Sequence, residues 1–220
     1  MVIPDFKKEE ELLGKGYRLI AGIDEAGRGP LVGPVVAGAV IIGGDPALAE
    51  ELIRLGVRDS KQVSEKKREK LYDFIAREAE CWAVASIGSE VIDEINILNA
   101  TKQAMRKAAM ELRFRPDFLL IDGNATLSDF PFDQLAVPKA DERILSVSAA
   151  SIMAKVARDR ILADMDGEYP EYGFKAHKGY GTKAHLEALR KYGPCPFHRR
   201  SFEPVKSMIS EAERYGWSGF

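Results

Sequence analysis

The sequence has little cysteine and no long hydrophobic run, and each absence excludes a class of protein. Its two cysteines, Cys81 and Cys195, lie far apart and form no C-x-x-C pair. This argues against a disulfide framework and favours free thiols in a reducing compartment. The longest apolar stretches are only strand-length and the first eleven residues are rich in charge, so neither a membrane span nor a secretory leader is predicted. We therefore expect a cytoplasmic protein.

A strong excess of one charge is also missing. The chain has 32 Lys and Arg against 34 Asp and Glu, a net charge of −2, which argues against a protein that coats nucleic acid by charge alone. Basic residues are concentrated at 54–70 and 178–206, and each stretch is either a solvated face or part of a binding surface. Arg199 and Arg200 are expected on such a surface, where they would follow a phosphate backbone.

What is present predicts an α/β fold. The chain has 220 residues, of which 45% are hydrophobic, enough to bury a core. Apolar runs predict strands at residues 17–27, 34–42, 81–88, 117–123 and 134–140. The first two should pair antiparallel, because the turn between them is too short for a crossover helix. Helical spacing predicts helices at residues 64–80, 89–113, 141–162, 183–192 and 203–214. The expected architecture is a mixed sheet flanked by helices, with a small helical extension at the C-terminus.

Four acidic residues stand where strands are interrupted or end. Asp24 and Glu25 interrupt an apolar strand, and an unpaired carboxylate there is costly, so Asp24 requires a cation. Neighbouring strand residues point to opposite faces, so both can serve one site only near a strand end. Asp122 ends an apolar strand, the usual crevice position, although alone it is equally a turn residue. Asp141 precedes a helix, and alone it is better explained as an N-cap.

If these four carboxylates converge, they repel one another, and a hard dication would resolve the conflict. Oxygen ligands without nearby His or Cys favour Mg²⁺ or Mn²⁺ over Zn²⁺. Two such ions can activate a water and stabilise the leaving oxygen of a phosphodiester.

The segment Gly27-Arg28-Gly29 allows the backbone to approach a ligand closely, with a guanidinium nearby. By itself this signal is weak. The glycine spacing does not fit a dinucleotide-binding fingerprint, which should also open a helix.

Together these segments resemble ribonuclease HII, the type 2 ribonuclease H family, from about Leu19 to Val205. The motifs that carry the resemblance occur in family order: GIDEAGRGPLVGPVV, DSK (59–61), IDEINILNATKQAM, LLIDG, SAASIMAKVARDR, HKGYGT and HRRSF. On this resemblance we divide the chain into an N-terminal segment (1–16), an RNase H-like catalytic core (17–182) and a helical extension packed on it (183–220).

The resemblance implies metal-dependent endonucleolytic cleavage of RNA in RNA–DNA hybrids. It also implies incision on the 5′ side of single ribonucleotides in duplex DNA, leaving a 3′-hydroxyl and a 5′-phosphate. The family's four catalytic, metal-binding acids fall on Asp24, Glu25, Asp122 and Asp141. Its element that senses the 2′-hydroxyl falls on Gly27, Arg28 and Gly29, and the tyrosine that packs on the following deoxyribose falls on Tyr180.

One departure from the family pattern lies beside an acid. The family commonly has Lys-Gly-Asp where this chain has Lys139-Ala140-Asp141, and alanine restricts the backbone where glycine does not. Lys61, Ser148 and Ser151 are hypothesised to bind phosphates, the alternatives being a solvated lysine and helix-packing serines. A monomer is expected, and a replication clamp is left open as a partner. The C-terminal YGWSGF is either a docking segment or a loose end.

Three other functions compete with this interpretation. Ribonuclease HIII shares this core but has an additional N-terminal domain, for which about sixteen residues before the first strand are too few. A non-catalytic hybrid-binding module gains nothing from clustered acids facing phosphates. A mononucleotide-binding protein would need the P-loop lysine pattern, which is missing.

Overall fold

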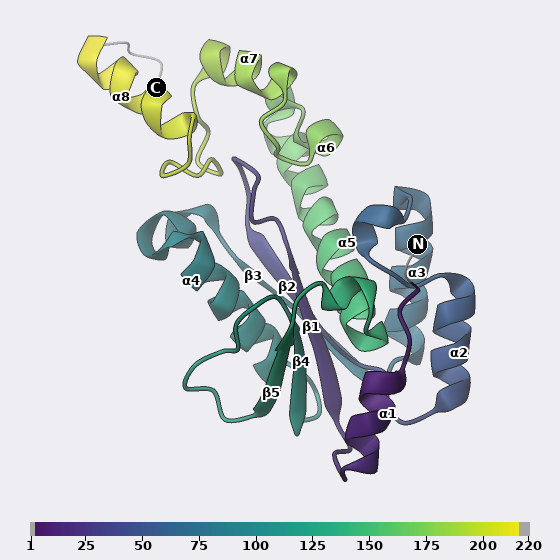
Figure 1. Cartoon of the computed structure of the whole chain (residues 1–220). Helices are drawn as coiled ribbons and strands as arrows, with labels where there is room; N and C mark the ends of the chain where they lie inside the picture. The colour runs from purple at the N-terminus through teal and green to yellow at the C-terminus, as the bar shows by residue number, and fades with distance from the viewer. Residues whose placement is uncertain (1–2, 216–220) are drawn as a thin grey trace.

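The computed structural model describes residues 3–215 and shows a five-stranded mixed sheet with helices on both faces (Figure 1). The strand order is β3-β2-β1-β4-β5. The strands are β1 (Ile20–Ala26), β2 (Val35–Ile41), β3 (Cys81–Ile87), β4 (Phe118–Asp122) and β5 (Asp133–Val137). The first three strands pair antiparallel, and β4 and β5 run parallel to β1. The predicted mixed sheet and its antiparallel hairpin are therefore confirmed.

The helices fall into two layers and a C-terminal group. They are α1 (Lys7–Gly14), α2 (Pro46–Leu55), α3 (Glu65–Glu78), α4 (Ser89–Met110), α5 (Leu145–Glu168), α6 (Phe174–His177), α7 (Lys183–Tyr192) and α8 (Val205–Tyr215). All five predicted helices are present. Three helices, α1, α2 and α6, were not predicted. The short amphipathic patterns of α1 and α2 are interrupted by charge and proline, and α6 has only four residues, too few to show helical periodicity. No helix within the described residues is long and apolar enough to cross a membrane.

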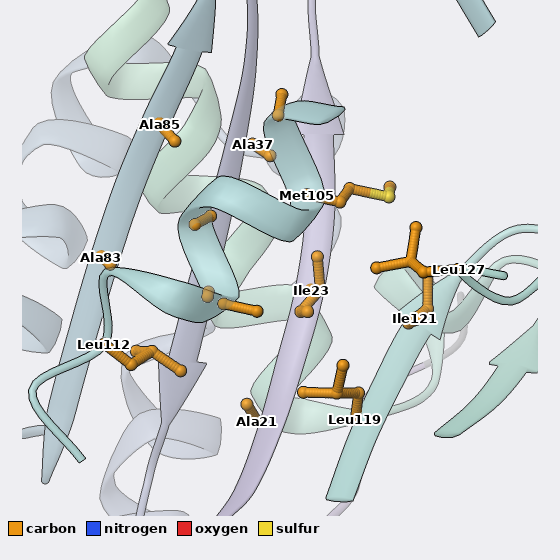
Figure 2. Close-up of a cluster of buried hydrophobic side chains, with 14 of the residues drawn as sticks. Ala21, Ile23, Ala37, Ala83, Ala85, Met105, Leu112, Leu119, Ile121 and Leu127 are labelled. Atoms are coloured by element: carbon orange, nitrogen blue, oxygen red, sulfur yellow. The ribbon is translucent and has the colours of Figure 1, made fainter. Parts of the chain in front are cut away.

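One face of the sheet is covered by α4, and the core between them is largely aliphatic. Figure 2 shows Ile23 of β1, Leu119 and Ile121 of β4, and Met105 of α4 in this cluster. These side chains are nearly inaccessible to solvent, which provides most of the hydrophobic driving force for docking α4. Residues 21, 23 and 25 of β1 alternate onto this face, so Glu25 points toward the α4 side.

The opposite face of the sheet is covered by α5, with α2 and α3 packed beside it. This helix approaches the sheet closely because β1 and β2 have glycine where their side chains would meet it. A Cβ on Gly22 would lie 2.2 Å from the carbonyl carbon of Ser146, and one on Gly38 would lie 2.5 Å from the carbonyl oxygen of Ala150. Asp24 follows Gly22 on the same face, so its carboxylate points toward α5.

The N-terminal helix α1 is tied to the start of α5. The buried carboxylate of Glu9 accepts a 2.8 Å hydrogen bond from the N–H of Ser146, in the first turn of α5. It thereby serves as a helix cap supplied by a distant segment, since Ile144, the residue at the N-cap position, has no side-chain oxygen. At the other end of the chain, Leu189 of α7 and Val205 of α8 belong to an apolar cluster that also contains Leu162, in the C-terminal half of α5. The last residues of YGWSGF (216–220) lie outside the described part of the chain.

Candidate active site

Asp24 and Asp122 are brought side by side by the register of the sheet. β1 and β4 pair in parallel with Ile23 opposite Ile121, so Asp24 and Asp122 are the next two residues along the same direction. Residues in register on parallel strands point to the same face, and this face is the one covered by α5. Asp24 is 4% exposed. Neither aspartate forms an ion pair with any residue in the described range.

Glu25 joins the site from the other side of β1, where the strand ends. Its carboxylate lies 3.2 Å from a guanidinium nitrogen of Arg28. A hollow of about 100 Å³ is lined by Glu25 and Arg28 together with Asp122 and Gly123, which follow from β4. Asp24 and Glu25 point to opposite faces of β1, but Glu25 lies close to the end of the strand, where the two faces meet. Both carboxylates can therefore serve one site, as the sequence required.

Asp141 lies in a short 3₁₀ turn (Ala140–Glu142) between β5 and α5. The N–H of Ala140 donates a 2.7 Å hydrogen bond to a carboxylate oxygen of Asp122, which holds this turn against the end of β4. The N-cap alternative for Asp141 is wrong, since α5 begins later, at Leu145.

The alanine in this turn is accommodated without strain. The residue with a left-handed backbone is Lys139 (φ 57°), and Ala140 itself is not among those with positive φ. Ala140 is wholly buried in an apolar cluster. The departure from the family's glycine thus leaves Asp141 beside Asp122.

Burial and mutual repulsion raise the pKa values of Asp24, Glu25 and Asp141. The pKa of Asp24 is raised well above its ordinary value by burial and then by the charges of Glu25, Asp122 and Asp141. Burial also raises the pKa of Glu25, although Arg28 opposes the rise. For Asp141 the causes are burial and then the charge of Asp122. The charge of Asp122 contributes to each of these three rises, so the four carboxylates form one acidic cluster.

The acidic cluster fits a hard divalent cation. All of its ligand atoms are oxygens, and no residue between 3 and 215 forms an ion pair with its most buried member, Asp24. Within residues 3–215, no group of three or more His, Cys, Asp or Glu side chains is arranged so that it could hold a metal ion. Mg²⁺ needs few protein carboxylates, because it keeps several waters and takes phosphate oxygens as well.

Lys61 is the cation nearest to Asp141. Its ammonium lies 3.6 Å from Asp141 and 3.9 Å from Asp59, while its side chain is 79% exposed. Burial lowers the pKa of Lys61, but the surrounding carboxylates outweigh this and raise it. The lysine is therefore charged and reaches solvent at the edge of the acidic cluster.

The two serines predicted to bind phosphate are both buried. The hydroxyl of Ser148 lies 2.7 Å from the carbonyl oxygen of Asp141 and 3.0 Å from that of Ile144. Ser151 is 3.0 Å from the hydroxyl of Ser60 and hydrogen-bonds Asp24, which opposes the rise in that residue's pKa. Ser148 thus hydrogen-bonds the backbone of Asp141, and Ser151 hydrogen-bonds the carboxylate of Asp24. That either serine binds a phosphate stays a prediction.

Gly27, Arg28 and Gly29 form the first part of a turn (residues 27–34) between β1 and β2, which we call the sensor turn. Gly27 has φ 96°, a conformation that favours glycine. A cavity of about 200 Å³ is bordered by the sensor turn, Lys61 and Tyr180. The Tyr180 ring is half exposed, and a Cβ on Gly29 would lie 3.8 Å from it. The structure thus brings the predicted recognition residues to one cavity beside Glu25.

The structure corrects the prediction for one arginine, Arg199, and gives a role to another, Arg158, for which none was predicted. Arg199, expected on a basic surface, is 0% exposed, and its guanidinium hydrogen-bonds backbone carbonyls of the sensor turn. Arg158, for which the sequence predicts no role, is 1% exposed. Charge counting along the chain cannot detect such residues, because all of their partners but Lys178 lie more than a hundred positions away in sequence.

Comparisons with known proteins identify the family. A family model described as Ribonuclease HII matches residues 21–205. Ribonuclease HII of Caldicellulosiruptor bescii is 49% identical over 205 residues, covering 93% of this chain and 95% of that protein. The chain belongs to the ribonuclease HII family.

Solved structures agree with this family. Ribonuclease H2 from Pyrococcus horikoshii OT3 superposes with a TM-score of 0.74 at 30% identity, covering 89% of this chain and 99% of that one. RNase HII in a PCNA:RNase HII complex from Archaeoglobus fulgidus gives a TM-score of 0.72 at 28% identity, covering 84% and 95%.

Membership of the ribonuclease HII family makes the chain a type 2 ribonuclease H, a hydrolase that cleaves the RNA strand of RNA–DNA hybrids, in a family that depends on divalent metal ions. This sets aside the hybrid-binding, mononucleotide-binding and ribonuclease HIII alternatives.

Proposed function

We propose that this chain incises duplex DNA on the 5′ side of a single ribonucleotide, as well as cleaving RNA–DNA hybrids, and that Asp24, Glu25, Asp122 and Asp141 carry the chemistry. The observation that supports this most is the acidic cluster itself, in which buried carboxylates raise one another's pKa values. Such a cluster is costly unless a cation binds it.

The cations are proposed to be Mg²⁺ or Mn²⁺, held by these four carboxylates. When bound, two such ions supply Lewis-acid activation of the attacking water and neutralise charge on the leaving oxygen. The reaction adds water across the phosphodiester: the P–O3′ bond breaks, the 3′ oxygen takes a proton, and the phosphate stays on the 5′ side of the ribonucleotide. Lys61, at the exposed edge of the cluster, is proposed to bind a substrate phosphate, with Ser148 and Ser151 holding Asp141 and Asp24 beneath it.

Recognition of the ribonucleotide is assigned to the sensor turn and Tyr180. The 2′-hydroxyl distinguishes RNA from DNA and can both donate and accept hydrogen bonds. Backbone groups at Gly27, Arg28 and Gly29 are open enough to contact it. The exposed ring of Tyr180 across the same cavity would pack on the deoxyribose that follows.

We further propose the division into an N-terminal segment (1–16), a catalytic core (17–182) and a C-terminal extension (183–220), acting as a monomer. A replication clamp is a candidate partner, supported by the structural neighbour from Archaeoglobus fulgidus, which was solved as a PCNA:RNase HII complex.

The experiment that tests the function is incision of a 5′-labelled DNA duplex containing one ribonucleotide, with Mg²⁺, with Mn²⁺ and with EDTA. An all-DNA duplex controls for specificity. The Asp24→Asn variant removes a proposed ligand, and Asp164→Asn makes the same change at an exposed aspartate of α5. We expect metal-dependent incision 5′ to the ribonucleotide by the wild type and Asp164→Asn only. A duplex that is bound but left intact with both metals would contradict the proposal.

A further inference from the structure

Arg158 and Arg199 lie beneath the sensor turn as a pair of buried arginines. Arg158 is 1% exposed and Arg199 is 0% exposed. Neither forms an ion pair with a carboxylate in the described part of the chain. Burying an arginine without a carboxylate is costly unless its donors are satisfied in another way. Here every guanidinium nitrogen of both residues donates to a backbone carbonyl.

Arg199 holds the sensor turn through four such hydrogen bonds. Its Nη2 donates to the carbonyl of Gly27 at 2.6 Å. Its Nη1 donates to those of Arg28 and Pro30, both at 2.9 Å. Its Nε donates to that of Gly33 at 3.0 Å. One side chain therefore holds the first two residues of the proposed 2′-hydroxyl sensor, and Pro30 and Gly33 beyond it.

Arg158 connects the sensor turn to the loop that carries Tyr180. Its Nη2 and Nε donate to the carbonyls of Val32 and Pro34 at 3.2 and 3.1 Å, and its Nη1 donates to that of Lys178 at 3.0 Å. It also explains why residue 27 is glycine, since a Cβ there would lie 2.0 Å from Nε of Arg158.

These bonds determine which backbone groups the turn presents to a ligand. The carbonyls of Gly27 and Arg28 are directed inward, onto Arg199. No described residue accepts a hydrogen bond from the N–H of Arg28 or Gly29. The turn therefore offers donors to the cavity that Tyr180 borders, with two buried positive charges behind it.

We propose that Arg199 and Arg158 are positioning residues for ribonucleotide recognition: Arg199 orients the sensor turn, and Arg158 sets its distance from the Tyr180 loop. This inference rests on the proposed function, because it assumes that the turn reads the 2′-hydroxyl. Lysine cannot replace either arginine, since one ammonium cannot reach carbonyls spread along the planar fork of a guanidinium.

The test measures binding discrimination in the Asp24→Asn background, where cleavage does not interfere. The dissociation constants of an all-DNA duplex and of the same duplex with one ribonucleotide are measured by fluorescence anisotropy in Mg²⁺ at fixed salt, and their ratio is taken. Arg199→Lys and Arg158→Lys are compared with Arg77→Lys, the same change at an exposed arginine of α3. We expect both buried variants to lower the ratio by about tenfold, the effect of losing one or two charge-assisted hydrogen bonds, and Arg77→Lys to leave it unchanged.

A ratio is used because a merely structural role would not change it. A loosened or partly unfolded variant binds both duplexes more weakly by the same factor, and that outcome would overturn the inference. The two variants are independent, so the failure of one to fold leaves the other to decide. If the Asp24→Asn parent binds both duplexes alike, the proposed recognition by the turn fails and the inference fails with it. If the parent discriminates and the folded arginine variants discriminate equally well, only the inference fails.

Discussion

The acidic cluster and the two buried arginines both border the sensor turn, and both place charge out of water. Only the charges of the arginines are compensated by groups of the protein that the structure describes. Each guanidinium nitrogen of Arg158 and Arg199 donates to a carbonyl. Asp24, equally buried, forms no ion pair with a Lys, Arg or His of the described residues and is repelled by three other acids. A buried charge satisfied by backbone groups supports the scaffold, whereas one left uncompensated indicates where a ligand of opposite charge binds.

Replacing Asp24 should produce the largest change in activity, and its effect on stability should distinguish the acidic cluster from the buried arginines. Asp24→Asn is expected to lower kcat for the single-ribonucleotide duplex on the order of 10³-fold or more, because electrostatic stabilisation of the transition state is lost. In EDTA the same variant should unfold at a higher temperature than the wild type, since a repelled buried charge is removed. Thermal unfolding in EDTA measures this, with Asp164→Asn as control. A lower unfolding temperature for Asp24→Asn would contradict the assignment of Asp24 to an uncompensated cluster.

Two buried histidines, His185 and His198, are hydrogen-bonded in series to the backbone of Tyr180, and they allow a test of this part of the protein by pH. Nδ1 of His198 accepts from the N–H of Cys195, so neutral His198 carries its proton on Nε2 and donates to Nε2 of His185, 3.0 Å away. Nδ1 of His185 then donates to the carbonyl of Tyr180 at 2.9 Å. Burial lowers the pKa of His185 to about 4 and that of His198 to about 3.

The sign of the pH dependence follows from these values. Below about pH 6.5 the unfolded chain protonates both histidines while the folded protein does not, so their contribution to stability is complete above that pH and is lost as the pH falls toward 4. We expect a loss on the order of a few kcal/mol, opposed by the buried acids, whose raised pKa values act in the other direction. The His185→Gln/His198→Gln double variant isolates the histidine part: its unfolding free energy, from urea titrations, should fall less than that of the wild type between pH 6.5 and 4. Equal slopes would show that these rings are not held neutral.

Replacing Arg199 should destabilise the folded protein, whereas replacing Asp24 in the absence of metal should stabilise it. Arg199→Lys is expected to lower the free energy of unfolding by about 2–4 kcal/mol, because buried carbonyls lose their donors. Urea denaturation measures this, and Arg77→Lys, on the surface, should differ from the wild type by less than about 0.5 kcal/mol. If Arg199→Lys and Arg77→Lys lower the free energy of unfolding equally, the hydrogen bonds of the Arg199 guanidinium do not hold the sensor turn.

Much of the site could be predicted from the sequence. The parts that were not predicted have one physical cause in common. The strand positions of Asp24 and Asp122 follow from apolar runs, and the register of β1 and β4 brings them together as expected. The buried roles of Glu9 and Arg199 depend on backbone groups more than a hundred residues away, and local composition carries no trace of such partners. The N-cap alternative for Asp141 failed because a distant carboxylate, Glu9, caps α5 instead.

The smallest effect is expected where a buried hydroxyl only supports an acid. Ser148→Ala removes the hydrogen bond to the carbonyl of Asp141 and should lower stability by about 1 kcal/mol. It should reduce kcat by less than about tenfold, because the Asp141 turn is also held by the bond between Ala140 and Asp122. A loss of activity as large as that of Asp24→Asn, in a folded variant, would instead place Ser148 against the substrate, in line with the hypothesis drawn from the sequence.

The most direct test of the central claim is a titration of Mn²⁺ into the metal-free protein, with free Mn²⁺ followed by electron paramagnetic resonance. The wild type and Asp164→Asn should bind the ion with the same affinity, and Asp24→Asn should bind it at least about tenfold more weakly, since the uncompensated charge is what attracts it. Equal Mn²⁺ affinity in all three proteins would contradict the claim that the acidic cluster is a cation site.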